Sequence, residues 1–481
     1  MKIRIFGMAL ALGFSLVSCD DFLTENPRHS LTSDNAVTNY SSAKNIVNGI
    51  YGEYETSNLG GELYGNQHCM AGFWKYKNLM YNMSYNQTSG AGESDRIWSS
   101  LYGIINTANA AIISIEKLDE SLFPSAAEKS RLIAEARCFR GYCYLELLWC
   151  FGHWFDNADS PYGIIYRDQI SELSNLQVGR STVGESYQYI LDDLEYAEQN
   201  LGDYESPRFM SKQFAKAMHA KLLMVRGWDG DYAEALTLVN GLMSDNCPWE
   251  METDLALLYE NGWDSKENLF SKYLGDTSSY YGYAGYEFNY SYALYYNKED
   301  FTDMAQEWLN NDERAAIIFG EARSPENWDD RTDDGILVKL YHRGREAGKN
   351  DMYATYPMRK AELYLMKAEL LARTSPSDIQ GALAPLNEMR AKYTNPVMAP
   401  VTGINTHEEL MDAIFKEYVV TLFMENETPW FASLRFEHDG KPWINTLKPD
   451  VNFSSNQYCW PIPDDEIKAH TNKIDQNPGL E

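Results

Sequence analysis

The chain has 481 residues, a formal net charge of −29 at pH 7 and 44% hydrophobic residues. This length exceeds what one hydrophobic core usually serves, and the apolar content excludes a disordered chain, so we expect several packed units or a repeat array. The acidic charge opposes contact with phosphate backbones and anionic lipids, which excludes a general nucleic-acid-binding protein.

The N-terminus has the features of an export signal. Lys2 and Arg4 precede an apolar stretch at residues 5–18, which is too short to span a bilayer because a membrane helix needs about 20 residues. The sequence Leu-Val-Ser-Cys that ends at Cys19 resembles a bacterial lipobox, after which the cysteine carries acyl chains. We expect a signal peptide at residues 1–18 and a lipid-anchored segment with a first helix at residues 19–59. The alternative is a secreted protein in which Cys19 falls there by chance.

Helical periodicity dominates the rest of the chain. Residues 134–151 place Ala136, Phe139, Cys143 and Leu147 at spacings of three and four, which predicts one buried helical stripe. Further helices are expected at residues 98–118, 183–201, 213–226, 232–243, 358–373, 379–393 and 407–424. The predicted fold class is therefore all-α, built from helical hairpins.

Two segments resemble copies of one unit. Residues 220–236 and 368–383 each show a helix with small residues, a short turn, and a second helix that begins with an acidic residue. Small residues let helices approach closely, as stacked tetratricopeptide-like hairpins require. We expect a scaffold of such hairpins at residues 98–244 and 351–481. The alternative is that the likeness of the two segments is coincidental.

Two segments lack helical periodicity and are rich in Tyr, Gly and Asn. They are a predicted variable ligand loop at residues 60–97 and a predicted irregular, aromatic-rich lobe at residues 245–350. Long irregular segments inside a compact domain tend to carry function. We therefore expect the binding site in these two segments.

Motifs for catalysis or metal binding are absent from the sequence. It contains no nucleophile elbow, HExxH, Walker loop or GxGxxG, and its 7 cysteines form no C-x-x-C pair. The acidic run DDRTDDG at residues 329–335 lacks the ligand spacing of an EF-hand and is interpreted as a solvated loop. We expect no enzymatic activity, no metal site and no cofactor, and we interpret the cysteines after Cys19 as buried free thiols.

Aromatic rings and amides are interleaved in both irregular segments. In residues 286–292 aromatic and polar residues alternate, so an extended chain would place a row of rings on one side. Rings beside amides suit sugars, whose C–H faces stack on rings while their hydroxyls need hydrogen-bond partners. The alternative is that these rings pack the segments onto the scaffold. The candidate ligand-binding residues are Trp74, Tyr76, Asn78, Tyr81, Asn82, Tyr283, Tyr286, Tyr290, Trp328 and Arg331.

Motifs along nearly the whole chain resemble, in order, those of the SusD/RagB family of Bacteroidetes outer-membrane nutrient-binding lipoproteins. They are CDDFLTENP from Cys19, NGIY from Asn48, WSSLYGIINTANAAI from Trp98, EARCFRGYCYLELLWCFG from Glu135, YPMRKAELYLMKAELLAR from Tyr356, LNEMRAKY from Leu386 and WPIPDDEIKAHTNKIDQNPG from Trp460. One segment departs from the family pattern. Asn426 and Glu427 stand near a usual Glu-Gly, and Trp430 stands where Arg is common, in a segment that we interpret as scaffold.

The resemblance implies a scaffold of four tetratricopeptide-like hairpins that supports an irregular lobe. It also implies a lipid anchor on Cys19 at the outer face of the outer membrane, a SusC-like TonB-dependent transporter as partner, and no catalysis. Most members bind oligosaccharides and some bind peptides, through variable loops outside the shared motifs, so the ten candidate residues above are our own inference.

We therefore expect a cell-surface glycan-binding lipoprotein that delivers oligosaccharide to a transporter. One alternative is a peptide-binding member of the same family. Another is a tetratricopeptide scaffold that binds only proteins, and a third is a glycosidase.

Overall fold

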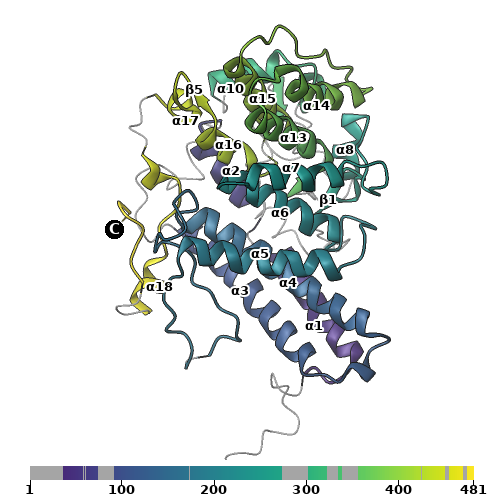
Figure 1. Cartoon of the computed structure of the whole chain (residues 1–481), viewed down its shortest axis with the longest axis vertical. Coiled ribbons are helices and arrows are strands. Elements are labelled where there is room, and N and C mark those ends of the chain that lie inside the picture. The colour runs from purple at the N-terminus through teal and green to yellow at the C-terminus, as the bar shows by residue number, and fades with distance from the viewer. Residues whose placement is uncertain are drawn as a thin grey trace, which may run out of the picture.

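The computed structural model describes most of the chain. The described residues are 36–57, 59, 61–73, 92–172, 174–272, 302–321, 334–337, 356–423, 425–449, 454–469 and 474–480. The expected signal peptide and Cys19 lie outside them. Figure 1 shows helices that follow one another along the long axis, from α3 (Gly92–Glu116) and α4 (Ala126–Phe151) in the lower half to α14 (Ile379–Lys392) and α15 (His407–Thr421) near the top. The expected helix-dominated fold class is confirmed.

Helix α4 is the most deeply enclosed helix of the lower half. It packs against α1 (Tyr40–Thr56), α3 and α5 (Val183–Asn200), and almost all of its side chains from Leu132 to Phe151 are buried. A helix covered on every side needs apolar residues all round, which explains its run of aromatic and aliphatic residues. Ser125 begins the helix, because its side chain accepts a hydrogen bond from the Glu128 amide.

The two similar sequence units form neighbouring helical hairpins. One comprises α6 (Lys212–Arg226) and α7 (Asp231–Leu242), and the other comprises α13 (Lys360–Thr374) and α14. Gly227 and Gly230 close the first turn with φ values of 65° and 89°, which favour glycine. Helices α7 and α13 pack against each other although the long lobe separates them in sequence. This contact is what the stacking of two like units predicts.

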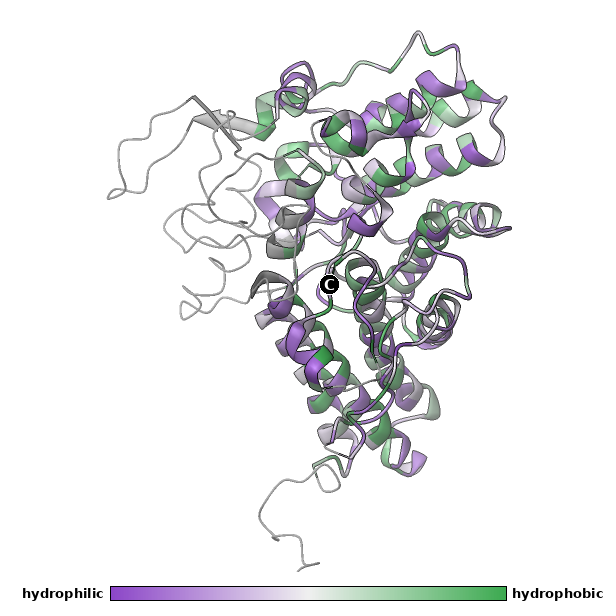
Figure 2. Cartoon of the chain, turned by 90° about the vertical axis from the view of Figure 1, so that its left-hand side faces the viewer, coloured by the Kyte–Doolittle hydropathy of each residue, from purple (hydrophilic) through white to green (hydrophobic). Residues whose placement is uncertain are grey.

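Shorter elements complete the helical part. They are α2 (Gly61–Met70), η2 (Glu120–Leu122), α8 (Leu255–Asn261), η3 (Gly262–Asp264), α10 (Asp303–Asn310), α11 (Ala315–Ile318), α16 (Thr428–Arg435), α17 (Trp443–Leu447), η5 (Ser455–Gln457) and α18 (Asp464–Ala469). Hydrophobic and hydrophilic residues alternate along the helices in Figure 2, as amphipathic packing requires.

The described strands form three antiparallel pairs of two to four residues. These pairs are β1 (Asn268–Phe270) with β4 (Met358–Arg359), β2 (Phe319–Glu321) with β3 (Asp334–Leu337), and β5 (Glu437–His438) with β6 (Lys441–Pro442). The first pair joins a strand within the lobe to the start of the C-terminal part of the scaffold, since Asn268 lies opposite Arg359 and Phe270 opposite Met358. The lobe contacts the scaffold at a second place as well, because the ring centroid of Trp308 in α10 lies 6.0 Å from that of Phe415 in α15.

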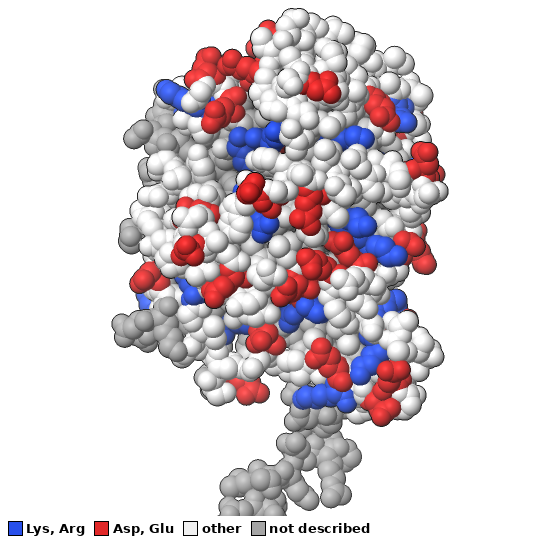
Figure 3. Space-filling view, viewed as in Figure 1, with Lys and Arg blue, Asp and Glu red and all other residues white. Residues whose placement is uncertain are grey.

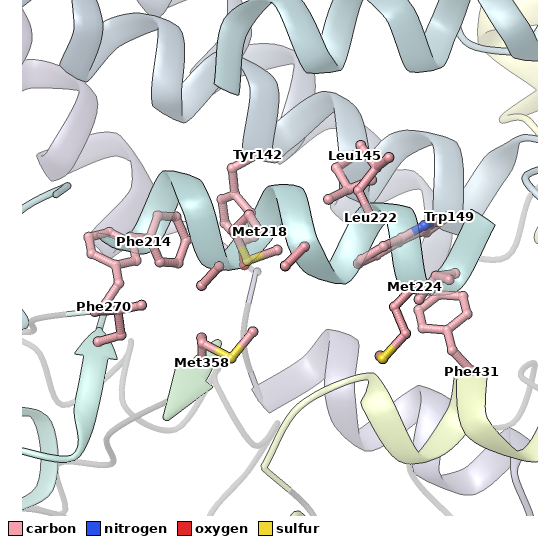
Figure 4. Close-up of a cluster of buried hydrophobic side chains, with 14 of the residues drawn as sticks. Tyr142, Leu145, Trp149, Phe214, Met218, Leu222, Met224, Phe270, Met358 and Phe431 are labelled. Carbon is pink, nitrogen blue, oxygen red and sulfur yellow. The ribbon is translucent and has the colours of Figure 1, made fainter. Parts of the chain in front are cut away.

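The core where α4, α6 and α16 meet is shown in Figure 4. The ring centroid of Phe214 lies 5.6 Å from that of Tyr142 and 4.9 Å from that of Phe270 in β1. Trp149 packs against Phe431 of α16 with a centroid distance of 4.9 Å. The β1–β4 pair and the C-terminal helices are thus held on the same apolar core as the stack.

Buried ion pairs hold the base of the lobe. Arg359, which is 1% exposed, donates to Glu267 and to Glu425 at 2.6 Å each and to the carbonyl oxygen of Thr421 at 2.7 Å. Both carboxylates are fully buried. Burial raises the pKa of Glu267, but Arg359 partly offsets this effect. The pairs satisfy charges that would otherwise be costly in the core.

The C-terminal segment packs back onto the end of α4. The Trp460 amide donates to the carbonyl oxygen of Cys150 at 2.5 Å, and the Asn477 side chain donates to the carbonyl oxygens of Phe151 and Trp460 at 2.9 Å each. Arg180 donates to the Asp475 carbonyl at 3.1 Å, and burial lowers the pKa of this arginine to about 10. Residues separated by more than 300 positions therefore share one hydrogen-bonded patch.

Two further expectations can be compared with the described residues. The predicted ligand loop at residues 60–97 begins with α2 and ends inside α3, so its outer parts are helical rather than irregular. Tyr64, Gln67 and His68 of α2 are buried, and this packing outweighs the weak helical pattern of a segment with two glycines. Cys138, Cys143, Cys150 and Cys459 are buried free thiols, as expected, and Cys247 is half-buried and also free.

Candidate functional site

The ten candidate ligand residues lie outside the described residues. They fall in residues 74–91, 273–301 and 322–333, whose flanking residues the structure does describe. The site is therefore defined by the places at which these three segments leave and rejoin the scaffold. Four contacts at those places are informative.

The first segment leaves the scaffold at Phe73, directly after α2. Phe73 is fully buried, its amide donates to the His68 carbonyl at 3.0 Å, and the two rings lie 5.9 Å apart. The amide of Thr302, where the second segment rejoins the scaffold, donates to the Phe73 carbonyl at 3.3 Å. The residue that precedes residues 74–91 and the residue that follows residues 273–301 are thus directly hydrogen-bonded to each other.

The second segment leaves the scaffold at Lys272, directly after β1. Its side chain is 1% exposed, and its ammonium group donates to the carbonyl oxygens of Ser57 and Leu59 at 2.6 and 2.9 Å. Carbonyls just beyond the end of a helix lack partners within that helix, so a cation placed there satisfies them. The lysine therefore ties the second segment to the chain that connects α1 with α2.

The third segment connects β2 with β3. Phe319 lies opposite Leu337 and Gly320 opposite Ile336, so residues 322–333 form the connection of an antiparallel hairpin. Trp328 and Arg331 lie in this connection. The scaffold contact of this hairpin is through α11, which packs against β2.

Asn426 joins the end of the lobe to the start of the first segment. Its side-chain amide donates to the Tyr356 carbonyl at 3.2 Å and to Glu362 at 2.8 Å. The backbone carbonyl oxygen of Asn426 lies 2.9 Å from His68 Nε2. A carbonyl can only accept, so His68 donates from Nε2. Tyr356 also donates from its hydroxyl to the Leu258 carbonyl at 3.1 Å.

A buried charge cluster lies directly beside the contacts that Asn426 makes, and it shares Glu362 with them. Lys221 donates to Glu427 at 2.5 Å and lies 3.0 Å from Glu362, with all three side chains at most 1% exposed. Burial alone would lower the pKa of Lys221, but the two carboxylates raise it above its ordinary value. Burial, and then repulsion from Glu427, raises the pKa of Glu146 well above its ordinary range.

Sequence analysis missed Asn426, His68, Lys272 and Lys221 as residues that hold the site. The one available signal was the departure from the family pattern at Asn426 and Glu427, which we interpreted as scaffold. The structure agrees that this segment is scaffold, and it adds that the segment contacts the bases of the first segment and of the lobe.

The described residues carry no group of side chains arranged to bind a metal ion. Within them, no group of three His, Cys, Asp or Glu side chains is close enough to hold a metal ion. None of the helices in the described ranges is long and apolar enough to cross a membrane. Acidic and basic side chains are interspersed on the face shown in Figure 3, which carries no continuous basic surface for a polyanion.

Two family models match the chain. A model described as starch-binding and associating with the outer membrane matches residues 21–224. A model described as the SusD family matches residues 290–480. The two matches leave out residues 225–289, which include α7, α8 and η3, and together they span the other helices described above except for the last two residues of α6.

Individual relatives agree with the family models. A SusD-like protein of Bacteroides ovatus is 29% identical over 175 residues, which are 36% of this chain and only 30% of that protein. A solved SusD superfamily structure from Bacteroides thetaiotaomicron matches with a TM-score of 0.70 at 20% identity, covering 91% of this chain and 99% of that one. A laminarin-binding SusD-like protein matches with a TM-score of 0.68 at 20% identity, covering 92% and 100%. At this identity the structural likeness concerns the fold.

Proposed function

Because the chain belongs to the SusD/RagB family, we propose that it is a cell-surface lipoprotein, anchored through Cys19, that binds oligosaccharide without converting it. It would deliver this ligand to a TonB-dependent transporter in the outer membrane. Starch binding and outer-membrane association in the family description, and laminarin binding by a structural neighbour, support a carbohydrate ligand and this location.

The observation that carries the proposal is the hydrogen bond from Thr302 to Phe73. It joins the bases of the two segments in which aromatic and amide residues are concentrated. A ligand that rests on one segment close to this point also reaches the other. We therefore propose that the rings of both segments contribute to a single surface, with Trp74 and Tyr286 as its main platforms, and that Trp328 of the third segment adds to it.

The number of rings limits the affinity. Each stacked ring contributes about 1 to 2 kcal/mol of burial, whereas association costs roughly 4 kcal/mol or more. Four rings at the upper value then leave about 4 kcal/mol, which is a dissociation constant of about 1 mM, so any tighter binding must come from hydrogen bonds to the sugar hydroxyls. Such affinities favour capture followed by release to a partner over long-term storage.

The proposal is tested by replacing Trp74, Tyr286 and Trp328 together with Ala. The variant should lose retention on affinity gels that contain the polysaccharide bound by the wild type, while its thermal midpoint stays nearly unchanged. The matched control replaces Leu122, Leu257 and Val397, three apolar residues exposed by 44%, 41% and 76%, and should migrate like the wild type. Unaltered retention of the first variant would show that Trp74, Tyr286 and Trp328 are not part of the binding site.

The class of ligand is tested separately. Calorimetry against a panel of oligosaccharides and against a peptide digest distinguishes the proposed ligand from peptides. Recovery of a labelled oligosaccharide intact after long incubation is the expected result for a protein that binds without cleavage.

A further inference from the structure

The segment between α5 and α6 exposes an aromatic ring that the proposed site does not include. Phe209 is 55% exposed, and it is the one exposed aromatic residue among those whose side chains the structure describes. Resting on the proposed function, we infer that Phe209, with Arg208 and Asp264 beside it, is a second platform that stacks against a neutral sugar unit of the same oligosaccharide.

The ring is held in place although it is exposed. Its centroid lies 5.7 Å from that of Tyr51 in an edge-on arrangement, and the Tyr51 hydroxyl accepts from the Met210 amide at 3.0 Å. On the N-terminal side of the dipeptide Arg208–Phe209, the Pro207 carbonyl accepts from the Ser271 amide at 2.8 Å. Both neighbours of the dipeptide Arg208–Phe209 are therefore fixed to other elements. A ring fixed in this way loses little conformational entropy when a ligand stacks on it.

The residue that precedes Phe209 belongs to an exposed ion pair. Arg208 donates to both carboxylate oxygens of Asp264, at 3.1 and 3.0 Å, and the two side chains are 40% and 52% exposed. Each carboxylate oxygen accepts more than one hydrogen bond, so Asp264 can accept from sugar hydroxyls without breaking the pair. An exposed ring whose neighbour in sequence belongs to such a pair matches a sugar, which presents a C–H face and hydroxyls at its edge.

The charges of the surroundings select the kind of sugar. The guanidinium of Arg208 is neutralised by Asp264, and the chain as a whole has a formal net charge of −29. An acidic sugar would meet this repulsive field without an unpaired cation to bind it. The platform therefore suits an uncharged hexose unit.

The platform lies beside the base of the second aromatic segment. Pro207 is bonded to Ser271, the residue before Lys272, after which residues 273–301 begin. A sugar chain that leaves the proposed surface on this side of the scaffold reaches Phe209 next. Long oligosaccharides should therefore gain from Phe209, and short ones should not.

The test compares the wild type with Phe209→Ala, Phe209→Trp and the control Leu257→Ala, an exposed apolar residue at 41%. Calorimetry with an oligosaccharide series of increasing length is the readout. Phe209→Ala should weaken binding of the longest members about fivefold to thirtyfold, the factor expected from loss of one ring contact, and leave the shortest unchanged. Phe209→Trp should bind at least as tightly as the wild type, and Leu257→Ala should equal it.

The outcomes separate this platform from the proposed function. If Phe209→Ala binds every oligosaccharide as the wild type does, the platform is overturned while the proposed function stands. If the wild type itself binds no oligosaccharide, the proposed function fails and the platform fails with it. Thermal midpoints of all variants should agree, because Phe209 lies at the surface.

Discussion

Asn426 and Tyr356 lie 70 positions apart, yet the side-chain amide of Asn426 donates to the carbonyl oxygen of Tyr356 at 3.2 Å inside the protein. The same amide reaches Glu362, and the Asn426 carbonyl accepts from His68. One turn between α15 and α16 thus fixes the end of the lobe and the end of α2 relative to each other.

Replacing Asn426 with Ala should loosen the end of the lobe and leave the end of α2 in place, because His68 bonds to the backbone carbonyl of residue 426, which Ala retains. The change leaves the Tyr356 carbonyl and one Glu362 oxygen with fewer donors, at a cost of about 1 to 3 kcal/mol for unsatisfied buried groups. Hydrogen exchange followed by mass spectrometry should rise at residues 356–360, and glycan affinity should fall at temperatures far below the unfolding temperature. Asn426→Asp should be at least as harmful, because it sets a carboxylate against Glu362.

Asn387 provides the control for that experiment. It also bridges two chain segments, since its side chain donates to the Val401 carbonyl at 3.0 Å and accepts from the Val401 amide at 2.7 Å. Asn387→Ala should lower stability without raising exchange at residues 356–360 or weakening glycan binding. Equal effects of the two substitutions on ligand affinity would contradict a positioning role for Asn426.

Replacing Arg359 with Ala should be strongly destabilising. The change leaves Glu267 and Glu425 buried in the core without the cation that pairs with them. Removing one partner of a buried ion pair typically lowers the free energy of unfolding by about 3 to 5 kcal/mol. Lys266→Ala is the matched control, because its pair with Glu250 has a distance of 3.3 Å but exposures of 49% and 70%. It should change stability by less than about 1 kcal/mol. Urea denaturation measures both values, and similar losses would show that burial does not decide the effect.

Glu55 should make stability depend on pH. Partial burial raises the pKa of this carboxyl from 4.5 to about 7, although Lys272 opposes the effect. The folded state then binds more protons than the unfolded state between pH 4.5 and about 7, so the free energy of unfolding falls as pH rises through this range. Because water screens the exposed part of the side chain, we expect a loss of about 1 kcal/mol.

The measurement for Glu55 is denaturation at pH 5 and pH 8 in the wild type and in Glu55→Gln. The difference between the two pH values should shrink in the variant. Glu195→Gln, at an exposed position of α5, is the control and should retain the wild-type difference. An unchanged difference in Glu55→Gln would show that other groups cause the pH dependence.

The helices of the stack could be predicted closely from the sequence. Residues 183–201, 213–226 and 379–393 differ from α5, α6 and α14 by at most one residue at either end, because apolar periodicity and side-chain caps agree there. The predicted helix at residues 134–151 began too late. Ser125 and Glu128 carry the start signal of α4, but its first turns are exposed and show no apolar stripe.

The contacts that hold the site could not be predicted. Arg359 meets Glu267 across 92 positions, and Lys221 meets Glu427 across 206. Nothing in local composition shows which of the 70 acidic residues will be buried beside which cation. The ten candidate ligand residues remain a prediction, since they lie outside the described residues.

The packing of the C-terminal segment on α4 has a consequence for biosynthesis. The carbonyls of Cys150 and Phe151 find their partners in Trp460 and Asn477, which the ribosome adds some three hundred residues later. Until then the Cys150 carbonyl lacks the Trp460 amide, and the Phe151 carbonyl accepts from Arg180 at 3.4 Å without the Asn477 side chain. The N-terminal half can therefore form its full set of hydrogen bonds only after the C-terminal segment has been synthesised.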